Sequence, residues 1–209
     1  MTDWTAWHAP YQDPSSELSR RLALVQRCIR TWASDQAPGP LRVLSLCAGQ
    51  GHDLVGALRD HPRRSDVHGL LVEKEESNVA RARAALSESG LSSLHPVVGD
   101  AGSTTAFATG VPAGLVLVCG VFGNIDDADV SRTIEHLPTL CSAGATVIWT
   151  RHRREPDLTP AIRGWFAGAG FEERGFFSPG REQFSVGVHR LSGQPEAFRP
   201  AVRLFAFTR

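Results

Sequence analysis

The sequence lacks the features that mark several common classes of protein. It has four cysteines but no C-x-x-C pair, and no Cys/His spacing of the zinc-binding type. No stretch approaches the ~18 apolar residues of a membrane span, and the first residues show no basic region followed by an apolar run. We therefore expect no metal, no membrane segment and no signal peptide, and this cysteine usage fits the reducing cytoplasm.

The chain also lacks an excess of charge of either sign. It has 22 Lys and Arg against 22 Asp and Glu in 209 residues. Nucleic-acid binders usually carry a net basic patch, so this balance disfavours DNA or RNA as a partner. The one basic cluster, residues 151–154, is more often a solvated loop than a phosphate site. A chain of this length can bury a full core, and we expect a single domain over residues 1–209.

What the chain does have is a glycine turn placed between a strand and a helix. Residues 42–46 form a short apolar run, Gly49 and Gly51 follow, and a helical pattern begins near Asp53. Glycine lets the backbone bend tightly and lets a ligand lie against it. A strand that runs into such a turn aims backbone N–H groups and a helix N-terminus at a ligand.

Two further predicted strands end in acidic residues. Residues 67–73 end in Glu73, which lies 22 positions after Gly51, and residues 95–98 lead into Asp100. A spacing of ~20 residues is typical of a second parallel strand that places a carboxylate beside a bound ribose. In a doubly wound sheet the carboxyl ends of parallel strands share one edge, so we expect the glycine turn and both acids to lie together there.

These motifs resemble the class I S-adenosylmethionine-dependent methyltransferases, over about residues 43–177. The resemblance implies an α/β, Rossmann-like doubly wound sheet of about seven strands, mostly parallel with an antiparallel C-terminal strand. It also divides the chain into an N-terminal lid and helix (residues 1–36) and a Rossmann-like core (residues 41–209). It implies S-adenosylmethionine as cofactor, S-adenosylhomocysteine as product, and a small-molecule acceptor methylated at O, N or S.

The resemblance assigns cofactor-binding roles to particular residues. The glycine turn would hold the methionine part, Glu73 the ribose, and Asp100 with Ala101 the adenine. The full predicted set is Ala48, Gly49, Gln50, Gly51, Asp53, Glu73, Lys74, Asp100, Ala101, Cys119, Gly120 and Asn124. Cys47 and Cys119 are expected to be neighbours that line the site as small buried residues rather than as nucleophiles.

The chain departs from the family pattern in the first turn. The family usually has an acid where Ser45 stands and a glycine where Cys47 stands. Asp53 could compensate by holding the methionine amino group, or it could be an acid favoured by the helix dipole. These departures keep open a domain that binds the cofactor without transferring methyl. A nicotinamide-dependent oxidoreductase is the other alternative, but its fingerprint needs a small residue where Leu54 stands.

The candidate catalytic residues are His8, Tyr11 and His152. Histidine suits proton abstraction near neutral pH, which is needed only if the acceptor must lose a proton. Residues 1–12 carry Trp4 and Trp7, and in this family such a segment often forms a lid. Asn124 is followed by isoleucine rather than by the Pro-Pro-aromatic motif of enzymes that methylate exocyclic amines, which favours a small-molecule acceptor.

Periodicity and turn residues predict the remaining elements. A helix should open at Asp13 as N-cap and Pro14, and others should cover residues 75–89, 126–137 and 158–169. A fifth strand is expected at residues 145–150. Three late strand candidates follow, at residues 171–177, 184–190 and 202–208, of which the family needs two. Either of the last two could be the inserted antiparallel strand.

Overall fold

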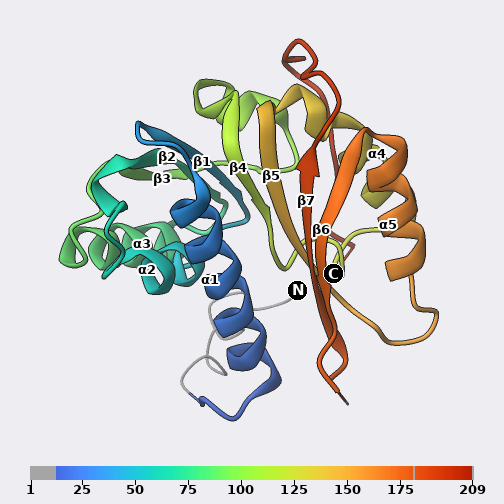
Figure 1. The fold of residues 1–209 in the computed structure, drawn as a ribbon, viewed down its shortest axis with the longest axis horizontal. Helices are drawn as coiled ribbons and strands as arrows, with labels where there is room; N and C mark the ends of the chain where they lie inside the picture. Colours follow the sequence, from blue (N-terminus) through green and yellow to red (C-terminus); the bar gives the residue numbers. More distant parts are fainter. Residues whose placement is uncertain (1–12, 181, 209) are drawn as a thin grey trace.

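The protein is built on one seven-stranded sheet (Figure 1). The structure, a computed structural model, describes residues 13–180 and 182–208. The strand order is β3-β2-β1-β4-β5-β7-β6. The strands are β1 Leu41–Leu46, β2 Val67–Glu73, β3 Leu94–Val98, β4 Ala113–Val118, β5 Cys141–His152, β6 Phe171–Phe177 and β7 Phe184–Leu191. Strands β1 to β5 pair in parallel, and β7 is antiparallel to both β5 and β6, so the predicted fold class is confirmed.

Helices cover both faces of the sheet. One apolar cluster joins α1, α2 and α3 to one face, and a second joins α4 and α5 to the other. The α-helices are α1 Glu17–Asp35, α2 His52–Leu58, α3 Glu76–Glu88, α4 Asp127–His136 and α5 Thr159–Gly168. The 3-10 helices are η2 Arg64–Asp66, η3 Thr104–Gly110 and η4 Leu137–Thr139. None of the helices within residues 13–180 and 182–208 is long and apolar enough to cross a membrane.

Helix α1 begins three residues later than predicted. Its N-cap is Ser16, whose hydroxyl accepts the N–H of Ser19 at 3.0 Å. Asp13 instead accepts the N–H and the hydroxyl of Ser15, at 2.8 and 2.7 Å, in a turn that precedes the helix. The prediction of Asp13 as N-cap was therefore wrong, because a serine nearer the helix competes for the same role.

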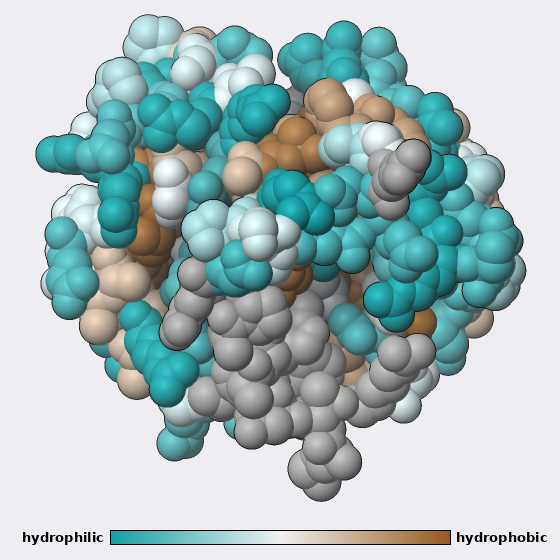
Figure 2. Space-filling model, turned by 90° about the horizontal axis from the view of Figure 1, so that it is seen from below, coloured by the Kyte–Doolittle hydropathy of each residue, from teal (hydrophilic) through white to brown (hydrophobic). Residues whose placement is uncertain are grey.

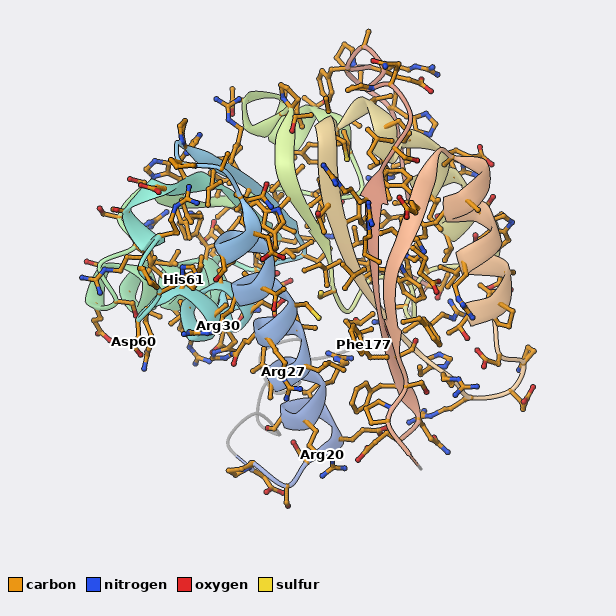
Figure 3. The ribbon with its side chains drawn as sticks, viewed as in Figure 1. Arg20, Arg27, Arg30, Asp60, His61 and Phe177 are labelled. Atoms are coloured by element: carbon orange, nitrogen blue, oxygen red, sulfur yellow. The ribbon has the colours of Figure 1, made fainter. Side chains whose placement is uncertain are left out.

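Polar contacts fix α1 against α2. Gln26 donates to the carbonyl of His52 at 2.9 Å, and Arg30 donates to the carbonyl of Ala57 at 2.7 Å. Figure 3 shows Arg30 on the side of α1 that faces His61 and Asp60, while Arg20 lies toward the start of the helix. Arg20 forms an ion pair with Glu182, at 2.6 Å, in the loop between β6 and β7. Helix α1 is thus tied to both halves of the sheet.

Two of the three predicted late strands are present, as β6 and β7. Strand β7 is the inserted antiparallel strand, between β5 and β6. Residues 202–208 form no strand, and their only ladder contact is an isolated bridge between Ser103 and Arg203. The fifth strand is longer than predicted, since it extends over Cys141–His152.

The topology defines one edge at which ligands are expected. The chain passes from β1 outward to β2 and β3 and then returns to β4 on the other side of β1. The switch point of a doubly wound sheet therefore lies between the carboxyl ends of β1 and β4, where such sheets bind their ligands. Figure 2 looks at the molecule from the side of this edge, where hydrophobic surface lies among hydrophilic side chains.

Candidate functional site

The turn after β1 has the backbone shape that its glycines predicted. Gly49 and Gly51 have φ of 55° and 75°, and Gly51 is the N-cap of α2. Cys47 also has a positive φ, 55°, which is uncommon for a residue with a side chain. The Ala48 N–H donates to the carbonyl of Val72 at 3.0 Å, so the turn is fixed to the end of β2.

Glu73 holds this turn directly. Its side chain is buried, and one carboxylate oxygen accepts the N–H of Gly49 at 2.8 Å. The other oxygen accepts the N–H of Glu75 at 3.0 Å. A carboxylate has about four acceptor positions, so two remain after these contacts. Glu73 can therefore brace the glycine turn and still accept two hydroxyl groups of a ligand.

Opposite charges meet beside the first turn of α2. Asp53 is half-buried, and burial raises the pKa of its carboxyl to about 6, against the opposing effect of Arg21 on α1. Asp53 also lies close enough to Cys119 to add to the burial that raises the pKa of that thiol. Arg21 was not among the predicted site residues, because its place in α1 carries no local signal for the carboxyl end of β1.

Asp100 is fixed by contacts on both of its oxygens. One oxygen accepts the N–H of Gly102 at 2.9 Å, and the other forms an ion pair with Arg203 at 2.5 Å. Burial raises the pKa of the Asp100 carboxyl, but Arg203, Gly102 and the nearby Lys74 together bring it below its usual value. Ala101, which follows, is buried in the core.

The turn after β4 is braced by contacts within it and with two other segments, β5 and the C-terminal residues. The N–H of Gly120 donates to the hydroxyl of Thr150 on β5 at 2.9 Å, and the Asn124 amide donates to the carbonyl of Gly120 at 2.7 Å. The carbonyl of Asn124 accepts the N–H of Thr208 at 3.0 Å. Thr150 was predicted to lie in the fifth strand but not to be a site residue. Its position near the end of β5 indicates that role only once β5 is known to pair with β4.

His152 lies against the same turn. It is the last residue of β5, and its side chain is half-buried. A Cβ built on Gly123 would lie 3.2 Å from Cδ2 of His152, so the imidazole packs directly over Gly123. The adjacent Arg151 is buried and donates to the carbonyl of Phe122, which makes the first residue of the basic cluster structural.

The predicted residues do not all converge. Gln50 donates to Asn78 on α3 at 3.2 Å, and Lys74 is exposed. Cys47 packs with the apolar cluster on the α4 side of the sheet and Cys119 with the cluster on the α1 side, so their side chains do not share one pocket face. The strands are neighbours as expected, but the two side chains point to opposite faces. His8 and Tyr11 lie outside the described residues.

A groove beside α1 has one end far from this site, although its lining residue Cys28 lies close enough to Cys119 to contribute to the raised pKa of that thiol. It has a volume of about 510 Å³ and lies between α1 and the strands β5, β7 and β6. It includes Thr146, which pairs with Arg190 and precedes His152 by six residues along β5. At about 3.3 Å per residue, that end of the groove is roughly 20 Å from the ligand edge.

The fold is that of the class I S-adenosylmethionine-dependent methyltransferases. Magnesium protoporphyrin IX methyltransferase from Synechocystis PCC 6803, solved with bound S-adenosylmethionine, superposes with a TM-score of 0.69 at 16% identity, over 92% of each chain. An O-methyltransferase family protein from Burkholderia thailandensis gives 0.61 at 18% identity, over 88% of this chain and 61% of that one.

A third solved structure is a complex with a small molecule. The O-methyltransferase family 2 protein from Planctomyces limnophilus, in complex with apigenin, gives a TM-score of 0.57 at 18% identity, over 84% of this chain and 62% of that one. No family model matches the chain, and no curated protein matches it in sequence.

Proposed function

We propose that this protein binds S-adenosylmethionine at the ligand edge and transfers its methyl group to a small-molecule acceptor. The observation that carries the proposal is the contact between Gly49 and the buried Glu73, because it joins a carboxylate to the glycine turn at the carboxyl ends of β1 and β2, beside the switch point. The fold shared with methyltransferases supports the same conclusion.

The donor groups of the site fit this cofactor. Glu73 has acceptor positions for two ribose hydroxyls, and Asp100 with Ala101 offers a carboxylate acceptor and a backbone donor for adenine. Asp53 and Arg21 carry the two charges that complement an amino acid zwitterion. The nicotinamide alternative is disfavoured, because the third small position of that fingerprint is filled by Leu54, which is buried.

Bound S-adenosylmethionine would supply an electrophilic methyl group with a neutral thioether as leaving group. The task left to the protein is to align the acceptor and to exclude water. Asn124 lies in the turn after β4 and His152 packs against that turn, and we assign both to the acceptor side. His152 would take a proton from a hydroxyl or thiol acceptor, a role that a histidine can fill near neutral pH.

Calorimetry with S-adenosylhomocysteine tests the binding half of the proposal. Glu73→Gln keeps an acceptor for the Gly49 N–H but loses the charge, and should weaken binding by about 1.5–3 kcal/mol, the scale of hydrogen bonds to charged groups. Glu76→Gln, an exposed acid in the first turn of α3, is the matched control and should leave affinity unchanged. Binding of NAD without binding of S-adenosylhomocysteine would overturn the proposal.

Turnover separates an enzyme from a protein that only binds the cofactor. The wild type should methylate at least one member of a panel of small phenols, thiols and amines. His152→Ala should reduce the rate for phenols and thiols while the affinity for S-adenosylhomocysteine stays the same. Cofactor binding with no turnover across the panel would favour the non-catalytic alternative.

A further inference from the structure

The chain after β7 returns to the ligand edge as a strap, defined here as residues 199–208. Figure 1 shows the chain looping beyond the end of β7 and running back behind the sheet to the C-terminus. The strap passes first along η3 and then along α4. The N–H of Leu204 donates to the carbonyl of Gly102 at 2.8 Å, and that of Ala206 to the carboxylate of Asp129 at 2.8 Å.

The strap is anchored in the core and is not a loose tail. Leu204 and Phe205 are fully buried, in the cluster between η3 and α4. The hydroxyl of Thr104 donates to the carbonyl of Arg199 at 2.9 Å and accepts the N–H of Val202 at 3.0 Å. A Cβ on Gly102 would lie 2.2 Å from the carbonyl oxygen of Phe205, so this close approach requires glycine.

The anchored strap places the guanidinium of Arg203 beside Asp100, a predicted site residue. Arg203 forms the bridge to Ser103 and directly precedes the two buried anchors of the strap, and its guanidinium reaches the Asp100 carboxylate at 2.5 Å. The N–H of Gly102 donates to the other oxygen, so contacts on both oxygens fix the orientation of the Asp100 carboxylate. About two acceptor positions of the carboxylate remain for a ligand.

We propose that Arg203 is a positioning residue for adenine recognition: it fixes the orientation of Asp100 so that this carboxylate selects a purine with a 6-amino group. The inference rests on the proposed function. A carboxylate only accepts hydrogen bonds, so it favours an amino group over hydrogen or a carbonyl at the same place. Without Arg203 the half-exposed side chain of Asp100 must be ordered when the ligand binds, which lowers affinity.

The test compares two ligands on four proteins. The ligands are S-adenosylhomocysteine and its analogue with hydrogen in place of the 6-amino group. The proteins are the wild type, Arg203→Ala, Arg203→Lys and Arg199→Ala. Arg199 is the matched control, because it lies on the same strap and pairs with Glu196 at 2.7 Å, away from Asp100. Circular dichroism melts check that each variant is folded, and Arg203→Gln replaces Arg203→Ala if the latter is not.

Arg203→Ala should weaken binding of S-adenosylhomocysteine about 3- to 5-fold, the upper end of the scale for an exposed ion pair, and should leave the analogue within about 1.5-fold of wild type. Arg203→Lys should recover part of the loss, and Arg199→Ala should change neither affinity. Removing the cation of Arg203 raises the pKa of Asp100, so the carboxylate becomes protonated at a higher pH as the solution is acidified. Arg203→Ala should therefore lose its binding of S-adenosylhomocysteine at a higher pH than the wild type does.

Four results would overturn the inference. Equal losses for both ligands would mean that Arg203 only stabilises the strap. Tighter binding of S-adenosylhomocysteine by Arg203→Ala would mean that Arg203 competes with adenine for Asp100. If the wild type binds neither ligand, the proposed function fails and this inference fails with it, whereas binding of both ligands with equal affinity by every variant refutes only the role of Arg203.

Discussion

Two ionisable residues, the half-buried Asp53 and the buried His189, should give this protein opposite responses to acid. Burial raises the pKa of Asp53 to about 6, whereas burial lowers the pKa of His189 to about 4, a shift that Glu173 opposes. His189 is kept neutral in the core, where its Nδ1 accepts the indole N–H of Trp149 at 3.1 Å. Between pH 4 and pH 6 the folded state therefore binds an extra proton at Asp53 and lacks one at His189.

Asp53→Asn should change how stability depends on pH. Because the folded pKa of Asp53 lies above the unfolded value, the wild-type carboxyl destabilises the fold progressively as the pH rises from 4 to 6. Removing it should raise the free energy of unfolding at pH 7 by about 1–2 kcal/mol and leave it unchanged near pH 4. Urea titrations at several pH values measure this, and an unchanged value at pH 7 would contradict the raised pKa of Asp53.

His189→Gln tests the opposite slope. The folded pKa of His189 lies below the unfolded value, so wild-type stability from this residue is present above about pH 6.5 and is lost as the pH falls toward 4. Glutamine keeps an acceptor for Trp149 but does not titrate. The variant should therefore become relatively more stable as the pH falls from 6.5 to 4.5, while Asp53→Asn shows a steeper acid loss than wild type. Parallel curves for all three proteins would refute both assignments.

At the scale of elements, the pairing of β5 with β7 depends on one glycine. Gly187 lies opposite Trp149, and a Cβ there would be 2.2 Å from Cε2 of the indole. Trp149 is fully buried and stacks on Phe166 at 5.9 Å, so it has no room to move aside. Gly187→Ala should destabilise the protein by about 3 kcal/mol through overpacking.

A second glycine provides the control for this prediction. Gly164 lies in α5, and a Cβ there would meet no atom within 4 Å. Gly164→Ala should be neutral or should stabilise the protein by up to about 1 kcal/mol, since alanine is the better helix former. In thermal melts the Tm of Gly187→Ala should therefore fall while that of Gly164→Ala stays the same or rises. Equal destabilisation of the two variants would mean that backbone flexibility rather than Trp149 sets the effect.

The local sequence pattern predicted most helices and strands, but it did not predict what residues 202–208 pack against. The apolar runs and glycine turns placed β1, β2 and β4 because a buried strand and its turn are encoded within a few residues. Residues 202–208 alternate in the same way and were predicted as a strand. Their alternation instead reflects burial of Leu204 and Phe205 against η3 and α4. The pairing of Arg203 with Asp100 joins residues 103 positions apart, which no local signal encodes.

For the whole molecule, the role of the N-terminal segment as a lid stays a prediction. Residues 1–12 carry His8 and Tyr11 and lie outside the described residues. Deleting residues 2–11 should leave the core folded, because the described sheet and helices begin later in the chain. The deletion should abolish methyl transfer and lower cofactor affinity, as expected when a lid no longer excludes water. Full activity in the truncated protein would assign acceptor binding to Asn124 and His152 alone.

Ligand binding should also stabilise the whole fold, because the site draws on distant parts of the chain. The glycine turn, Glu73, Asp100 and the strap belong to segments that unfold together if the sheet is lost. S-Adenosylhomocysteine at 100 times its Kd should add about 2.7 kcal/mol to the free energy of unfolding. For a chain of this size that corresponds to a rise in Tm of roughly 5–10 °C. NAD at the same concentration should give no shift, and Glu73→Gln should need a higher concentration of S-adenosylhomocysteine for the same shift. A rise in Tm with NAD equal to that with S-adenosylhomocysteine would contradict the assignment of this edge to an S-adenosyl cofactor.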